Sequence, residues 1–219
     1  MNKNLLLFYL LISTFSYSQV QKRFYVNDAK TIDYVTVNFC VNDSARISKV
    51  TVLLEKTTYK NEEIIQNLIT YLKEIQYYPD SKLRNNCYDS TFEFVNKNYE
   101  NAELNESDYA KCNKFKTGNF RYADFRVKET KIKRRKNKQI EKNGKRNKDD
   151  PFKEKYKISW SSPCEYQLEF LTANSAEREK FIGESIKVKI IALIDNGYVF
   201  KAKLLDYHET INVILIDSE

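Results

Sequence analysis

The sequence predicts an α+β amino-terminal domain of strand, strand, helix and strand, followed by an all-β antiparallel domain that forms a meander or small barrel. Two observations carry this prediction. In the first half, two alternating apolar runs precede a single amphipathic stripe. In the second half, short alternating runs recur to the end with turn residues between them. The 219 residues are 42% hydrophobic with four glycines and three prolines, so both halves should fold.

The first eighteen residues have the three-part layout of a secretory signal. Lys3 begins it, residues 5–12 are apolar, and the small residues Ser16 and Ser18 flank Tyr17. The apolar run has about eight residues, whereas a membrane-spanning helix needs roughly twenty. We therefore expect cleavage after Ser18, a periplasmic or secreted protein of a Gram-negative envelope, and no transmembrane segment after signal cleavage. The alternative is a short buried helix.

The first predicted element of the mature chain is a β-hairpin. Residues 35–41 alternate apolar and polar side chains, and residues 47–54 do so again. Between them, Asn42, Asp43 and Ser44 favour a turn. Each strand should therefore bury one face.

One helix and a third strand complete this domain. Asn61 suits a helix N-cap, and Glu62 and Glu63 suit the positive end of the helix dipole. Pro79 closes the helical region, and residues 89–94 alternate as a strand. The apolar stripe of the helix consists of Ile64, Ile65, Leu68, Ile69, Leu72 and Ile75.

Residues 30–96 resemble the carboxy-terminal domain of TonB. The resemblance rests on this order of elements and on Tyr77, an aromatic residue two positions before Pro79 at the helix end. It implies a small sheet in which the third strand lies antiparallel beside the first, with the helix on one face. It also implies that an extended peptide of an envelope partner pairs with an exposed sheet edge.

Four cysteines follow the predicted signal, and an even number in an exported protein favours disulfides. Their order along the chain allows three pairings. The TonB resemblance implies that Cys40 and Cys87 lie together on the outward face of neighbouring strands and form a bridge. Cys112 then pairs with Cys164, which gives one bridge in each domain. The alternative is buried free thiols.

The second domain is predicted to span residues 111–219, after an acidic and polar linker at residues 99–110. Asp195, Asn196 and Gly197 predict a type I′ hairpin turn. A brief helix is expected within residues 175–181. Strands are expected near residues 120–122, 130–141, 156–160, 166–170, 186–194, 198–204 and 211–216.

Residues 111–217 resemble a group of small uncharacterised bacterial envelope proteins. The resemblance rests on Cys112 and the Phe-Lys-Thr-Gly run at residues 115–118, together with residues 158–160 and 164–166. It implies no established activity.

Residues that could support catalysis are scarce. His208 is the single histidine and lies in a predicted turn without a nucleophile motif elsewhere. The glycines are isolated, so no phosphate-binding loop is present, and the cysteines lack metal-ligand spacing. We therefore expect no enzyme activity, no cofactor and no metal. A carboxylate enzyme is the remaining alternative, because paired carboxylates are defined by position in space.

The basic charge is concentrated in one segment. Residues 126–155 contain fourteen lysines and arginines against five acidic residues, whereas the whole chain has a net charge of +7. Such a segment can bind anionic lipid or polysaccharide, and export argues against nucleic acid. The alternative is a solvated hairpin without a partner, whose lysines prevent strand aggregation. The candidate contacts are Lys131, Lys133, Arg134, Arg135, Lys136 and Lys138.

These observations favour a non-catalytic interaction protein of the cell envelope that binds an extended peptide by strand addition. The alternative function is small-ligand or anionic-lipid binding through the second domain. The binding site would be lined by Phe120, Tyr122, Trp160 and Tyr166. The alternative is that these aromatic side chains simply fill the core.

Overall fold

The computed structural model describes residues 20–143, 153–174, 176–205, 207 and 209–217. The predicted signal peptide lies outside these residues. The chain divides into two compact units, Met1–Val95 and Asn96–Glu219. Each unit has its own hydrophobic core, so each is described by itself.

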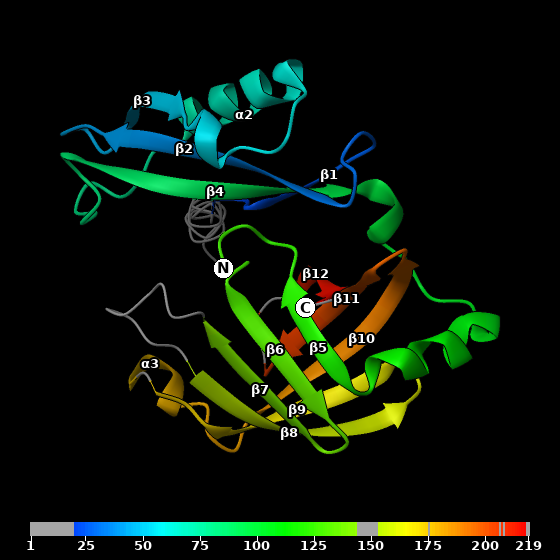
Figure 1. Ribbon diagram of the computed structural model, residues 1–219. Helices are drawn as coiled ribbons and strands as arrows, with labels where there is room; N and C mark the ends of the chain where they lie inside the picture. The colour runs from blue at the N-terminus through cyan, green and yellow to red at the C-terminus, as the bar shows by residue number, and fades with distance from the viewer. Residues whose placement is uncertain (1–19, 144–152, 175, 206, 208, 218–219) are drawn as a thin grey trace, which may run out of the picture. The chain divides into compact units, whose positions relative to one another are not determined.

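The first unit is a four-stranded sheet in the order β1-β4-β2-β3, with helix α2 over one face (Figure 1). This confirms the predicted α+β class. The described elements of this unit and the turn after it are β1 Arg23–Val26, β2 Ile32–Val41, β3 Ile47–Val52, the 3-10 helix η1 Leu54–Lys56, α2 Glu62–Glu74, β4 Asn86–Asn96 and the 3-10 helix η2 Lys97–Tyr99.

Helix α2 begins as the sequence predicts. The Asn61 side chain accepts a hydrogen bond from the Ile64 amide at 3.2 Å, which caps the first turn. The buried face carries Ile65, Leu68 and Leu72. These side chains pack in one core with the inward side chains of the sheet.

Strand β1 was not predicted. It lies next to β4, where Arg23 pairs with Glu93 at 2.9 Å and the Phe24 ring stacks on Phe94 with centroids 5.4 Å apart. A four-residue strand is too short for alternation to stand out from its surroundings. Because β1 covers the edge of β4, β3 forms the opposite edge of the sheet.

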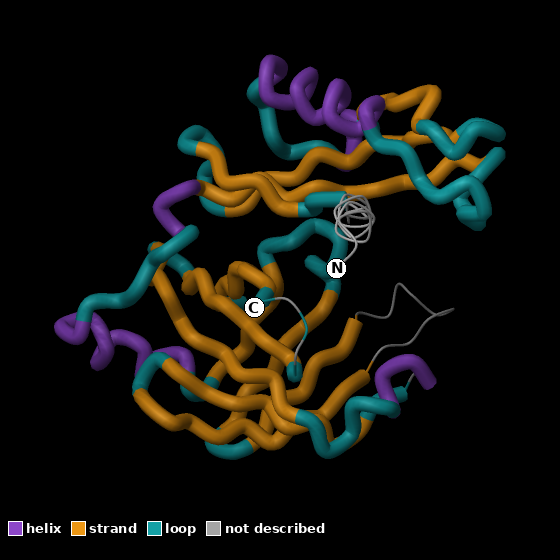
Figure 2. The backbone as a smooth tube through the Cα atoms, turned by 180° about the vertical axis from the view of Figure 1, so that it is seen from behind, coloured by secondary structure: helices purple, strands orange, loops and turns teal. Residues whose placement is uncertain are grey.

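The second unit is a closed eight-stranded antiparallel barrel (Figures 1 and 2). This confirms the predicted all-β class. Each strand pairs with its neighbour in sequence, and β12 closes the barrel by pairing with β5. The strands are β5 Gly118–Tyr122, β6 Thr130–Arg135, β7 Lys138–Asn143, β8 Lys153–Ser162, β9 Glu165–Thr172, β10 Ser185–Ile194, β11 Gly197–Leu204 and β12 Thr210–Ile216.

The β10–β11 hairpin forms where it was predicted, but its turn is not type I′. Such a turn needs a positive φ at both central residues, and neither Asp195 nor Asn196 has one. Gly197 is instead the first residue of β11. A Cβ atom there would lie 2.0 Å from the Ile214 carbonyl oxygen, so the glycine allows β11 to approach β12 closely.

Two short helices accompany the barrel. The 3-10 helix η3, Glu106–Phe115, was not predicted, whereas α3, Ala176–Glu179, lies within the expected helical segment. Residues 99–110, expected to form a linker, belong to the second unit. In this segment Leu104 and Tyr109 pack against the barrel core, and Glu103 pairs with Lys189 at 2.8 Å.

Both predicted disulfides are present. Cys40 and Cys87 are directly opposite each other in the β2–β4 register and form one bridge. Cys112 of η3 is bonded to Cys164 in the β8–β9 connection. Two disulfides are typical of a protein from an oxidising compartment such as the periplasm or the extracellular space.

Candidate functional site

One end of the barrel is filled by side chains. The last residue of η3, Phe115, is fully buried, and its ring lies 4.6 Å from that of Tyr198. Phe120 and Ile132 belong to the same buried cluster. The Cys112–Cys164 bridge ties the helix to this end, so the helix acts as a plug.

Arg134 lies inside this filled end. Its guanidinium donates to the Gln139 side chain at 2.8 Å and to the Phe115 carbonyl at 2.7 Å. It also donates to the hydroxyls of Tyr166 and Tyr198, both at 3.1 Å. The prediction that Arg134 contacts an anionic surface is therefore wrong, because strand alternation turns this side chain inward.

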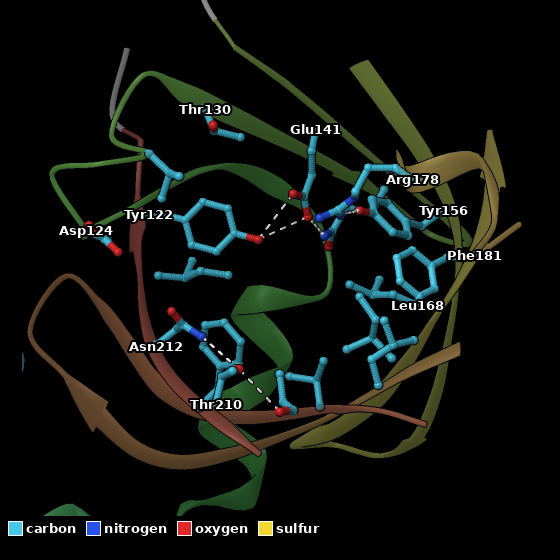
Figure 3. A pocket seen from close by; sticks show the side chains of 18 of the residues that line it. Tyr122, Asp124, Thr130, Glu141, Tyr156, Leu168, Arg178, Phe181, Thr210 and Asn212 are labelled. Carbon is cyan, nitrogen blue, oxygen red and sulfur yellow. Dashed lines mark hydrogen bonds between the residues drawn. The ribbon is translucent and has the colours of Figure 1, made fainter. Parts of the chain in front are cut away.

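The other end of the barrel contains a cavity of about 1090 Å³ (Figure 3). All eight strands contribute to its wall, as do α3 and the loops around it. Its polar and charged lining consists of Tyr122, Asp124, Arg126, Glu129, Thr130, Gln139, Glu141, Asn143, Tyr156, Tyr166, Arg178, Tyr207, Thr210 and Asn212. Its apolar lining consists of Val127, Leu168, Phe181, Ile186, Val188, Phe200, Ala202, Leu204 and Ile214.

Glu141 is a buried carboxylate in this wall, with 5% of its surface exposed. The Tyr122 hydroxyl donates to both of its oxygens at 3.2 Å (Figure 3), and Gln139 Nε2 donates to Oε1 at 2.6 Å. Gln139 in turn accepts from Arg134 through its amide oxygen. The amide thus links the cavity wall to the filled end of the barrel.

Burial raises the pKa of Glu141 to about 6, because water no longer solvates its charge. The hydrogen bonds from Gln139 and Tyr122 oppose this shift, and the neighbouring Glu154 adds to it. Burial likewise raises the pKa of Tyr122 well above its usual range, so its hydroxyl remains a donor at neutral pH.

A second carboxylate lies directly across from Glu141. Glu154 of β8 pairs with it in the strand register and is 1% exposed. Arg178 neutralises Glu154 with two hydrogen bonds of 2.7 Å, and the Tyr156 hydroxyl also donates to this carboxylate. Glu154 is buried whereas Arg178 is partly exposed, and the pair is held by its hydrogen bonds as well as by its charges.

The rim of the cavity is partly apolar. Val127, Ile182, Leu205 and Tyr207 are each 42% to 56% exposed and lie in three connections, β5–β6, β9–β10 and β11–β12. Successive connections of an antiparallel meander alternate between the two ends, so these three loops share the end opposite to the η3 plug. An apolar molecule entering the cavity would contact them.

The structure brings together part of the predicted ligand-lining set. Tyr122 and Tyr166 line the cavity. Phe120 and Trp160 do not, because Phe120 belongs to the filled end and the Trp160 ring packs on Tyr166 with centroids 4.6 Å apart. Sequence reasoning missed Glu141 and Arg178.

The described residues of the basic segment form an outer face of the barrel over β6, β7 and β8. Lys131, Lys133, Arg135 and Lys136 are exposed, and Lys138 is partly buried. Positive residues stand opposite one another across the strands, in the pairs Lys131↔Lys142, Lys142↔Lys153, Arg135↔Lys138 and Lys138↔Lys157. Directly opposite like charges repel.

The predicted turn residue His208 lies outside the described residues. Within the described ranges, no helix is long and apolar enough to cross a membrane.

Comparison of the chain with family models, with curated proteins and with solved structures found no match in any of the three.

Proposed function

We propose that the second unit binds a small, largely apolar molecule inside its barrel and does not transform it. The cavity of about 1090 Å³ carries this proposal. Ligand sites are typically cavities of about 300–1,000 Å³, and nine apolar side chains line this one beside fourteen polar or charged ones. An eight-stranded barrel is wide enough to hold one small ligand when side chains leave its interior open.

Two further features support this function. The exposed apolar side chains at the rim, including Ile182 and Tyr207, offer an entry route for a ligand that avoids water. The η3 plug and the buried Arg134 cluster fill the opposite end with packed and hydrogen-bonded side chains. A ligand would therefore enter from one side and remain in a blind pocket.

The test is saturable binding of Nile red, a neutral apolar fluorophore, to the full chain. We expect one molecule bound per protein, and at least a tenfold weaker affinity in Ala202→Trp, because the indole would occupy the cavity. Lys203→Trp is the matched control, since Lys203 is the next residue of β11 and is exposed. Equal binding by the two variants would contradict the proposal.

A second candidate function belongs to the first unit and is supported by the free edge of β3. In the described structure β3 pairs with β2 alone among the strands, while β1 covers the other edge of the sheet. An extended peptide of an envelope partner adding to β3 would shift the amide resonances of Ile47–Val52. Unchanged resonances with peptides from envelope proteins would count against strand addition.

A further inference from the structure

We infer that the ligand of the barrel is an amphiphile with a cationic, hydrogen-bond-donating head group, an amine, which contacts Glu141 while its apolar body fills the cavity. This inference rests on the proposed function and adds the chemical class of the ligand. It follows from three features of the cavity wall, which concern the carboxylate, the donors and the rings.

The first feature is that the carboxylate of Glu141 is held by neutral groups. Among the described residues, its hydrogen-bond donors are Tyr122 and Gln139. The charge of the nearby Arg178 lowers the pKa of Glu141, but the salt bridge of Arg178 is made to Glu154. The two oxygens of a carboxylate offer about four lone-pair sites. Tyr122 and Gln139 contribute one proton each, so the carboxylate retains capacity for a donor on the ligand.

The arginines that line the cavity are already neutralised. Arg178 pairs with Glu154 through two hydrogen bonds. Arg126 pairs with Asp124 in the same way, at 2.9 Å and 2.6 Å. Arg134 is absent from the lining, because Phe120, Tyr166 and Trp160 cover its guanidinium. An anionic head group would therefore compete with an existing carboxylate.

The second feature is that several polar hydrogens of the wall are already donated to protein acceptors. Tyr122 donates to Glu141, Tyr156 donates to Glu154, and Asn212 donates to Thr210 at 3.1 Å. The carboxylate oxygens of Glu141 and the hydroxyl oxygen of Tyr122 keep acceptor capacity. Such a wall recognises a donor, and an ammonium has donors and no acceptor.

The third feature is the set of aromatic rings around the carboxylate. The rings of Tyr122, Tyr156 and Phe181 lie around the cavity near Glu141 (Figure 3). The face of an aromatic ring attracts a cation, most strongly when both are removed from water. These rings would stabilise an ammonium without providing a second negative charge.

The experiment compares three ten-carbon probes of different head-group charge, the two ionic probes below their critical micelle concentrations and decan-1-ol below its solubility limit. Decylammonium, decan-1-ol and decanoate displace Nile red from the full chain at pH 7.5 and low ionic strength. We expect decylammonium to bind at least tenfold more tightly than decanoate and more tightly than decan-1-ol. Decanoate binding as tightly as decylammonium would overturn the inference and leave the proposed function standing.

The failure of the proposed function has a different signature. If Nile red and all three probes fail to bind, the cavity is not a ligand site and both proposals fall. Decan-1-ol serves as the internal reference, because it fills the cavity without a charge. If the protein binds decan-1-ol and decylammonium with equal affinity, the amine inference alone is contradicted.

The variant Glu141→Gln separates the carboxylate from the rest of the cavity. We expect its affinity for decylammonium to fall about tenfold, with the affinity for decan-1-ol unchanged within twofold. Glu169→Gln is the control, because Glu169 carries the same charge, pairs with Lys157 and is partly exposed. An unchanged decylammonium affinity in Glu141→Gln would overturn the inference. If this variant does not fold, the order of the three probes on the unmodified protein decides.

A pH series gives a second readout of the same contact. The charged and titratable groups around Glu141 are Tyr122 of β5, Arg134 of β6, Glu154 and Tyr156 of β8, and Arg178 of α3. We expect decylammonium to bind more weakly at pH 5 than at pH 7.5, because protonation of Glu141 removes the negative charge. The same dependence in Glu141→Gln would contradict the assignment to this residue.

Discussion

Glu141 is a buried carboxylate whose charge costs free energy in the folded protein. Its pKa is raised to about 6 from an ordinary value of 4.5. A raised carboxyl pKa favours the folded state fully below pH 4.5, and that contribution is lost as the pH rises through 6. A shift of this size corresponds to about 2 kcal/mol.

The first prediction concerns this cost. The free energy of unfolding of Glu141→Gln should be up to about 2 kcal/mol higher than that of the unmodified protein at pH 7.5. The difference between the two proteins should vanish at pH 4. Denaturant titrations at both pH values measure it. Glu169→Gln controls for an exposed charge, and an equal difference at the two pH values would contradict the prediction.

The second prediction concerns Gly197. Gly197→Ala places Cβ 2.0 Å from the Ile214 carbonyl oxygen, so a backbone segment must shift. We expect a loss of about 3 kcal/mol in the free energy of unfolding. The comparison is Gly183→Ala, where φ is +91° but no atom lies within 4 Å of the added Cβ, and where backbone strain should cost about 1–2 kcal/mol. A smaller loss at Gly197 than at Gly183 would contradict this assignment.

At the scale of elements, β6, β7 and β8 form a face on which positive residues oppose one another. Lys142 of β7 stands between Lys131 and Lys153 in the register. Cross-strand pairs of opposite charge contribute about 0.2–1 kcal/mol, and like charges destabilise. Natural selection tolerates such a cost when the charge serves solubility, edge protection or binding.

The third prediction tests this face. Lys142→Glu should raise the free energy of unfolding by about 1 kcal/mol at low ionic strength, because two repulsive pairs become attractive. Added salt should reduce the gain, since exposed charges are screened. Lys133→Glu, on β6, is the control, because Lys133 is exposed and stands opposite the neutral residues Asn119 and Ile140. A destabilised Lys142→Glu protein would show that the repulsion is negligible.

Helix η3 is an element that depends on its covalent tie to the barrel. With ten residues, η3 is unusually long for a 3-10 helix. Cys112 and Phe115 are its buried residues. Packing and the disulfide therefore hold the plug in place more than intrinsic helix propensity does.

At the scale of the whole molecule, each unit carries its own core and its own disulfide. The bridges close segments of 47 and 52 residues, one in each unit. In the chain-entropy model each contributes about 4 kcal/mol. The single tryptophan, Trp160, lies in the barrel, so its fluorescence reports the unfolding of that unit.

The fourth prediction uses this reporter. In full-length protein, replacing Cys40 and Cys87 by serine should lower the first unit's unfolding midpoint seen by circular dichroism, with the Trp160 transition unchanged. Replacing Cys112 and Cys164 by serine should lower the Trp160 transition and weaken Nile red binding. A Trp160 transition shifted equally by both double variants would contradict independent units.

Alternation predicted the strands well because each buries one face. Residues 35–41 and 198–204 form strands as expected, and the Asn61 cap begins the helix. Strand β1 and helix η3 were missed for a shared reason. Their stability comes from the sheet edge and the barrel end on which they pack, and neither surface is visible in a local pattern.

The candidate site was harder to predict because β7 inverts the usual pattern. Gln139 and Glu141 are buried, whereas Ile140 between them is partly exposed. The sequence pattern predicts that the isoleucine lies inside the barrel and that the carboxylate faces water. Tyr122, which is distant in sequence, and Gln139, which is two residues away, donate hydrogen bonds to Glu141. These bonds offset part of the free-energy cost of burying its carboxylate.

The sequence by itself determined the two fold classes and most of their strands, because alternation, capping and turn residues act over a few positions. The expectation of a TonB-like arrangement placed the third strand beside the first and, through that, predicted both disulfide pairings. The tertiary structure decided which end of the barrel interior is filled by side chains and which end contains the cavity. The closure of β12 onto β5 and the position of η3 determine where the filled end stops and the cavity begins. Tyr122 therefore borders the cavity, whereas Phe120, two residues earlier, is packed in the core. Such a distinction depends on distances across the barrel, which no local pattern contains.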